Sequence, residues 1–123
     1  MVDARLTKLA KVLVNYSLKL KKGDFFVIEG NVESRPLAVE VYKEAIAVGA
    51  NPLIVPIYEE CKEIMLRNGS DEQISYSNPL NVELMKKADA LLTIWAEVNT
   101  KALTTVDPSK LNLFAKGRKE SMN

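Results

Sequence analysis

Residues 6–56 decide the fold of this chain, and they read LTKLAKVLVNYSLKLKKGDFFVIEGNVESRPLAVEVYKEAIAVGANPLIVP. Apolar residues recur at helical spacing over 6–16, and Asp3 stands where it can cap the helix that this spacing predicts. Gly23 suits the left-handed turn that ends such a helix. The continuous apolar run 25–28 then predicts a short strand covered on both faces.

The second half of the stretch predicts another helix and another strand. Pro36 suits the first turn of a helix, because its missing N–H would be unpaired there in any case. Apolar residues at helical spacing follow, and Gly49 ends them. The second strand is predicted over 53–57, and Pro56 removes a backbone donor from it, so we expect this strand at an edge of the sheet.

The rest of the chain continues the alternation of helices and strands. The spacing predicts helices over 58–68, 70–77 and 81–88, a strand over 90–95 and a last helix over 110–121. The first of these helices is expected to bury Ile64 and Leu66, and the last one to turn Leu111, Phe114 and Ala115 inward.

Strands that alternate with helices predict an α/β domain with helices on both faces of a parallel sheet, of the Rossmann or flavodoxin type. Right-handed crossovers then give the strand order 2-1-3. Three strands are few for such a sheet, and the predicted pattern stops on a helix. We therefore interpret residues 1–123 as one domain that is incomplete at its C-terminus and belongs to a larger protein.

The composition excludes several classes of function. A net charge of +1 over 123 residues provides no field for nucleic acid or an anionic membrane. No apolar run approaches the roughly 18 residues of a membrane span, and the N-terminus lacks the features of a signal peptide. Cys61, the single cysteine, cannot form an internal disulfide. These features predict a soluble, cytoplasmic protein with no nucleic-acid or membrane partner.

The turn over 29–34 lies where a phosphate-binding loop would lie, directly after the first strand. It contains one glycine, whereas dinucleotide and P-loop fingerprints need several to bring the backbone close to phosphate. We read it as a strand-to-helix turn. Arg35 and the free amides of the following helix leave open a contact with a carboxylate or a phosphate.

The acidic cluster 59–63 has Glu59 and Glu63 on one helix face, which is a spacing that metal ligands use. Lys62 is interleaved and no histidine exists in the chain, so a solvated helix start is the better interpretation. We expect Cys61 on the core side of this helix, as a small apolar residue. Without histidine, neither a Ser–His–Asp nor a Cys–His arrangement can form.

Polar residues also follow the third strand. Ligands of open parallel sheets bind at the carboxyl edge, where the strand order switches. Trp95, Glu97 and Asn99 lie there, and Asn31 ends the first strand at the same edge. We therefore take Asn31, Arg35, Glu97 and Asn99 as candidate contacts with a substrate or with another domain.

Three strings in order resemble the N-terminal part of the thermophilic metallo-aminopeptidases, the aminopeptidase T and aminopeptidase S group. They are residues 6–30, 36–60 and 88–111, which together span most of the chain. The first string carries the most matched positions, which are Leu13, Tyr16, Ser17, Leu18, Lys21, Gly23, Asp24 and Ile28.

The resemblance implies an N-terminal α/β domain followed by a catalytic domain that this chain does not contain. In that family the second domain binds two divalent metals, of the zinc, cobalt or manganese class, and hydrolyses peptides within a homodimer. No catalytic residue and no metal ligand of the family falls in the matched region, so none is assigned here. This segment is expected to be a scaffold and an interface, inactive and metal-free by itself.

A different class of function stays open on the residues alone. The alternative to the favoured aminopeptidase segment is a stand-alone α/β module that binds a small anionic ligand at the start of its second helix, without catalysis. A nucleotide-binding Rossmann half is disfavoured because the required glycines are missing.

Overall fold

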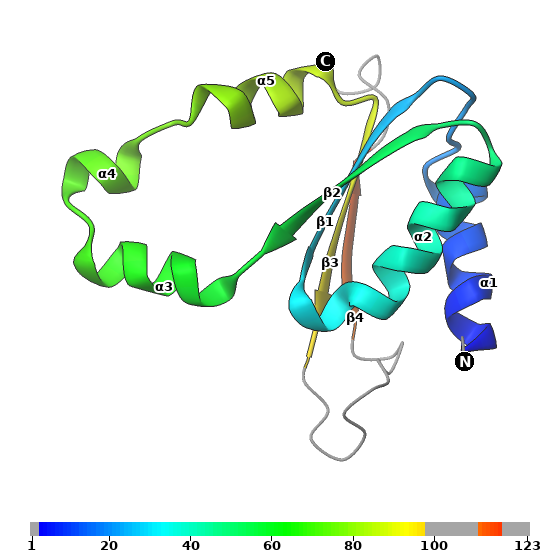
Figure 1. The fold of residues 1–123 in the computed structure, drawn as a ribbon, viewed down its shortest axis with the longest axis horizontal. Coiled ribbons are helices and arrows are strands. Elements are labelled where there is room, and N and C mark those ends of the chain that lie inside the picture. Colours follow the sequence, from blue (N-terminus) through cyan, green and yellow to red (C-terminus); the bar gives the residue numbers. More distant parts are fainter. Residues whose placement is uncertain (1–2, 98–110, 117–123) are drawn as a thin grey trace.

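The computed structural model describes residues 3–97 and 111–116 and centres on a four-stranded sheet of order β2-β1-β3-β4 (Figure 1). β1, Phe25–Asn31, pairs in parallel with β2, Asn51–Ile57, and with β3, Ala90–Ala96. The predicted α/β class and the order 2-1-3 are therefore confirmed. β2 lies at an edge, as Pro56 indicated.

The last described element is a strand where a helix was predicted. β4, Leu111–Lys116, lies antiparallel to β3, so the helix over 110–121 is wrong for these residues. Leu111 packs against the core, but Phe114 is 56% exposed and Ala115 is exposed, contrary to expectation. The free edge of β3 offers backbone partners to this segment, and that long-range pairing overrides a local helical spacing.

One face of the sheet is covered by two helices (Figure 1). α1, Ala4–Val12, begins at Asp3, whose carboxylate accepts a hydrogen bond from Arg5 N at 2.8 Å. The hydrogen bonds from the side chain and the backbone of Arg5 lower the pKa of Asp3. α2, Arg35–Ala47, follows a short 3-10 turn over Val32–Ser34. Both helices begin close to where the sequence predicted.

The first helix ends earlier than predicted. α1 continues as a π-helical turn over Leu13–Ser17, and the chain then turns through Lys19 and Gly23, with φ angles of 51° and 88°. Gly23 is left-handed as expected, because glycine adopts positive φ without a steric penalty. The π turn leaves Tyr16 74% exposed, so this residue does not belong to the apolar face of the helix.

The main core fills the space between these helices and the sheet. Its members are buried apolar side chains from α1, the π-helical turn, α2, β1 and β3, and the largest of them are less than 2% exposed. They include Val14, Phe26, Ile28, Leu37, Val41, Leu92 and Ile94.

The crossover from β2 to β3 forms an arm of three short helices that extends away from the sheet (Figure 1). They are α3, Glu59–Asn68, α4, Asp71–Ser75, and α5, Pro79–Lys87, and none of them contains a buried residue. Their positions follow the prediction, but the expected burial of Ile64, Leu66 and Cys61 is wrong, because these side chains are exposed. Helical spacing identifies an apolar face without saying what covers it.

The strand registers separate the two faces of the sheet. Residues paired across neighbouring strands share a face, and successive residues of a strand alternate between faces. Phe26 and Ile28 face α1 and α2, so Val27 faces the opposite side with its partners Leu53 and Leu91. Val27 is fully buried, yet it lies outside the cluster that packs against α1 and α2. In the described parts of the chain, no helix is both long and apolar enough to cross a bilayer.

Candidate functional site

Asn31 joins three elements at the carboxyl edge of the sheet. Its side-chain oxygen accepts from Ala96 N at 3.0 Å, and its amide nitrogen donates to Ala96 O at 2.7 Å. These bonds extend the β1–β3 contact beyond its last backbone pair, Gly30 and Ile94. The other amide hydrogen bonds Glu59 Oε1 at 3.0 Å, at the start of α3. Asn31 is 5% exposed and thus clamps β1, β3 and α3 together.

Gly30 and Ser34 pack the start of α2 tightly against the end of β1. Ser34 is 2% exposed, and its hydroxyl donates to Asn31 O at 2.6 Å. A Cβ at Gly30 would overlap Ser34 Oγ, lie 3.1 Å from Ser34 Cβ and lie 3.4 Å from Ile94 O. Glycine is therefore required here for close approach, and the single glycine of the turn has a packing role.

We expect Gly30→Ala to lower the free energy of unfolding by about 1–3 kcal/mol, because the new methyl group overpacks this contact. Ser34→Ala in the same chain removes the overlapping oxygen, so the double variant should lose less stability than the sum of the two single variants. Urea unfolding of the wild type, both single variants and the double variant measures this coupling. Additive losses would mean that the two side chains do not compete for space.

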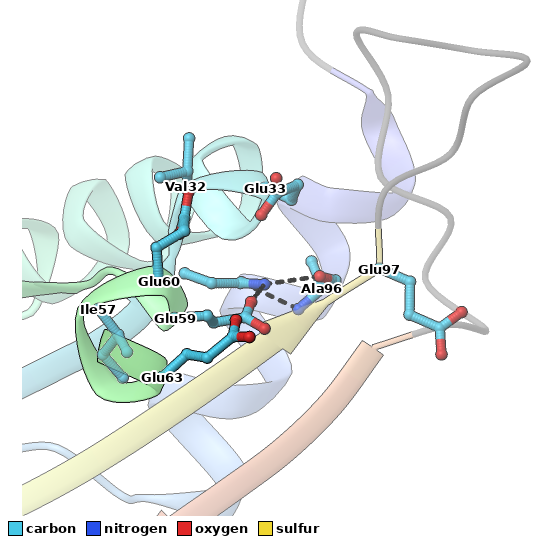
Figure 2. Close-up of a pocket in the computed structure, with 9 residues that line it drawn as sticks. Val32, Glu33, Ile57, Glu59, Glu60, Glu63, Ala96 and Glu97 are labelled. Atoms are coloured by element: carbon cyan, nitrogen blue, oxygen red, sulfur yellow. Dashed lines mark hydrogen bonds between the residues drawn. The ribbon is translucent and has the colours of Figure 1, made fainter. Parts of the chain in front are cut away.

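An acidic pocket of about 620 Å³ opens beside this clamp (Figure 2). Figure 2 shows Glu59, Glu60 and Glu63 together on one side, whereas the side chain of Glu97 points away from them. Glu63 forms an exposed ion pair with Arg67 at 2.7 Å. The residues that line the pocket come from the ends of β1, β2 and β3 and from the helix starts that follow, and they are Asn31, Val32, Glu33, Ile57, Glu59, Glu60, Glu63, Ala96 and Glu97.

The pocket does not have the donor arrangement of a metal centre. Among the described residues, no group of three or more His, Cys, Asp or Glu side chains is placed to hold a metal ion. Glu59 Oε1 accepts from Asn31, and Glu63 binds Arg67. The described residues thus do not fit a two-metal site, and no reaction step is assigned to them.

A second groove, of about 330 Å³, lies between the start of α2 and the edge strand β2. Its lining is mostly apolar and includes Val39, Ile54 and Pro56, with Arg35 at the helix start. Arg35 is exposed. The groove thus combines an apolar wall with one cation, which suits an apolar group that carries a carboxylate.

The three candidate residues that the structure describes line two neighbouring pockets. Asn31 lines both the acidic pocket, with Glu97, and the apolar groove, with Arg35, whereas Asn99 lies outside the described residues. Asn31 has its hydrogen-bonding groups satisfied within the chain, so its observed role is structural, and its contact with a substrate or a second domain stays a prediction.

The sequence analysis missed Glu59 as a member of this edge. The acidic cluster is exposed, as the interpretation of a solvated helix start required. Glu59 is the second residue after the end of β2, and only Tyr58 lies between them. The sequence analysis took polar residues at the carboxyl ends of the first and third strands as candidates. The same rule, applied to the end of the second strand, would have placed Glu59 beside Asn31.

Comparison with known proteins gives one family and one shared fold. The family model described as thermophilic metalloprotease (M29) matches residues 2–123. Among solved structures, wild-type AmpT from Thermus thermophilus is similar with a TM-score of 0.57 and 22% sequence identity. That match covers 87% of this chain and 28% of the AmpT chain, so this chain spans under a third of the length of AmpT. A comparison with curated protein sequences gave no match.

The structural match to AmpT, at 22% identity, shows that the fold is shared. It agrees with the parallel order of β2, β1 and β3. The family match covers residues 2–123, which include all three strings that carry the resemblance. This chain belongs to the thermophilic metalloprotease (M29) family.

Proposed function

We propose that the chain is the N-terminal α/β segment of a longer metal-dependent aminopeptidase, which removes N-terminal amino acids from peptides. The observation that carries this proposal is the family match over residues 2–123. The catalytic domain, with two divalent ions of the zinc, cobalt or manganese class, belongs to the remainder of that polypeptide. The homodimer and the cytoplasmic location are parts of the same proposal.

In this enzyme the present segment acts as a scaffold and as one wall of the substrate cavity. The carboxyl edge of the sheet is the side that meets the catalytic domain or the peptide, through Asn31, Arg35, Glu97 and Asn99. The acidic pocket supports this role, because parallel sheets bind their ligands at this edge. An arrangement of this kind positions a substrate and contributes no group to bond cleavage.

The test compares the 123-residue segment with the longer polypeptide encoded by the continuing reading frame. Each is assayed for release of the first residue from a free peptide and from the same peptide with an acetylated N-terminus. We expect the longer polypeptide to cleave the free peptide with added zinc, cobalt or manganese, to spare the acetylated one, and to lose activity with a chelator. The segment alone should stay at the level of buffer.

Two outcomes would contradict the proposal. Hydrolysis by the segment alone would place catalytic groups within these residues. A longer polypeptide that is inactive with all three metals would remove the peptidase assignment.

The second candidate function is a stand-alone module that binds a small anionic ligand without catalysis. The apolar groove with Arg35 at its end is the observation that favours it. A reading frame that stops after residue 123, together with binding of an apolar carboxylate that Arg35→Ala abolishes, would support this alternative.

A further inference from the structure

The apolar groove between the start of α2 and β2 has a buried floor and an exposed rim. Ile28 and Ala38 belong to its floor, and both are buried. Val39 and Ile54 belong to its rim, and they are 44% and 37% exposed. The register pairs Ile54 with Ile28, so the groove lies on the face of the sheet that α2 covers. A small ligand could therefore enter from solvent and contact apolar side chains.

Two polar side chains of the groove are available to a ligand, those of Arg35 and Tyr58. Within the described parts of the chain, neither side chain forms a hydrogen bond or an ion pair. The other polar side chains of the lining are occupied, because Asn31 bonds within the clamp and Ser34 donates to Asn31 O. The described lining contains no carboxylate, so nothing in it opposes the charge of Arg35. The groove thus favours an anion.

The acidic pocket beside the groove has the opposite charge. The two share Asn31 and Val32 in their linings, so they are neighbours. Five glutamates line the acidic pocket, and its described lining contains no lysine or arginine. These carboxylates repel an anion, whereas Arg35 attracts one. A molecule that extends from one to the other thus places its anionic end at Arg35. The acidic pocket acts here through repulsion, and no ligand is assigned to it.

The end of a peptide has the chemistry that the groove selects. A carboxylate accepts two parallel hydrogen bonds from a guanidinium, which is a strong and directional contact. The volume of about 330 Å³ is at the lower end of the range for ligand pockets, so it suits one terminal residue and not a long chain. The apolar wall suits a residue whose side chain is apolar.

We propose that the apolar groove binds the last residue of a short peptide substrate, with its apolar side chain against Val39 and Ile54 and its α-carboxylate at Arg35. This assignment rests on the peptidase function proposed above. It gives the longer enzyme a preference for short peptides that end in an apolar residue with a free carboxylate. Arg35 then determines specificity and takes no part in bond cleavage.

Ligand binding to the metal-free longer polypeptide tests the groove apart from hydrolysis. Saturation-transfer NMR measures the Kd of N-acetylleucine, of N-acetylleucinamide, which lacks the charge, and of N-acetylglycine, which lacks the apolar side chain. A chelator removes metal that would bind the carboxylate. The variants are Arg35→Ala and Arg35→Lys, so that a folding defect in one leaves the other. Arg5→Ala is the matched control, because Arg5 is exposed at the start of α1 and outside the groove.

We expect the wild type to bind N-acetylleucine about fivefold or more tightly than the amide, and about tenfold more tightly than N-acetylglycine. Arg35→Ala should remove the preference for the carboxylate. Arg35→Lys should keep part of it, because lysine is a point charge without the planar fork of arginine. Arg5→Ala should keep all of it.

Three binding results would overturn the proposal. They are equal affinity of the wild type for the acid and the amide, equal losses in Arg35→Ala and Arg5→Ala, and no measurable binding of N-acetylleucine. A tighter complex with N-acetylglycine than with N-acetylleucine would remove the apolar wall from the site.

Hydrolysis is scored separately, with metal added. Arg35→Ala should raise KM for alanyl-alanyl-leucine about fivefold with kcat nearly unchanged, and it should leave KM for the C-terminal amide of that peptide unchanged. Hydrolysis with the same KM in Arg35→Ala as in the wild type would overturn the substrate role of the groove. Binding that depends on Arg35 without any hydrolysis would support the carboxylate site and remove the peptidase assignment, so the two failures are distinguishable.

Discussion

Replacing Asn31 with alanine should lower the free energy of unfolding by about 2–4 kcal/mol, because it leaves buried backbone groups without partners. The side chain satisfies both the N–H and the C=O of Ala96, at 3.0 and 2.7 Å, beyond the last backbone pair of β1 and β3. Alanine offers neither a donor nor an acceptor at that place. The measurement is the urea midpoint of the wild type and the variant at equal slope.

Asn15→Ala is the matched control for this prediction. Asn15 also donates to a backbone carbonyl, that of Lys11 at 3.0 Å, and to Glu44 Oε1 of α2 at 3.3 Å, but both hydrogen bonds lie on the exposed surface. Water replaces the lost partner there, so the control should change stability by less than about 0.5 kcal/mol. Equal effects of the two variants would show that Asn31 does not clamp the sheet edge.

Asn31→Asp tests whether the sheet edge depends on the amide hydrogen bonds of Asn31 or only on the volume of its side chain. An aspartate keeps the acceptor for Ala96 N, but it places a carboxylate against Ala96 O and Glu59, which now accept hydrogen bonds from the amide. We expect a loss of stability at least as large as that of Asn31→Ala at neutral pH. A stable Asn31→Asp variant would mean that the amide hydrogens contribute little.

Phe26→Ala should cost about 3–5 kcal/mol of the free energy of unfolding, the range typical of large-to-small substitutions in a well-packed core. Phe26 is fully buried in β1, on the face that packs against α1 and α2. Removing its ring leaves a cavity at the centre of the domain. Thermal and urea unfolding both report the loss.

Phe114→Ala is the same chemical change on the face of the sheet opposite α1 and α2. Phe114 is 56% exposed in β4, so its truncation removes little buried surface from the described segment, and we expect a loss below about 1 kcal/mol. The two phenylalanine variants together test which face of the sheet carries the core. Similar losses for both would mean that the segment buries its two faces equally.

Local patterns were sufficient for most of the described elements. Asp3, Pro36 and the apolar runs that begin at Phe25 and Ala90 placed helices and strands near their observed bounds, because capping, proline geometry and burial act over a few residues. The strand order followed from the handedness of crossovers, which depends on backbone chirality and not on particular side chains.

Local patterns failed where partners were distant in the sequence. Leu111–Lys116 carries a helical spacing, but it becomes β4 because β3 leaves an edge with unpaired backbone groups. Ile64 and Leu66 follow an apolar helical face, yet the arm holds them away from the sheet. In both cases the outcome depends on which surface lies nearby, and a local window does not contain that surface.

By itself, the sequence determined the α/β class, the parallel order of three strands and the membership of a metallopeptidase family. Only the tertiary structure decided that Asn31 bonds Ala96 and Glu59, that the absence of a side chain at Gly30 leaves room for Ser34, and that Ile64 and Leu66 stay exposed. The reason is physical: periodicity records which residues avoid water, whereas a hydrogen bond between residues 65 apart exists only after the sheet has brought the strand ends together.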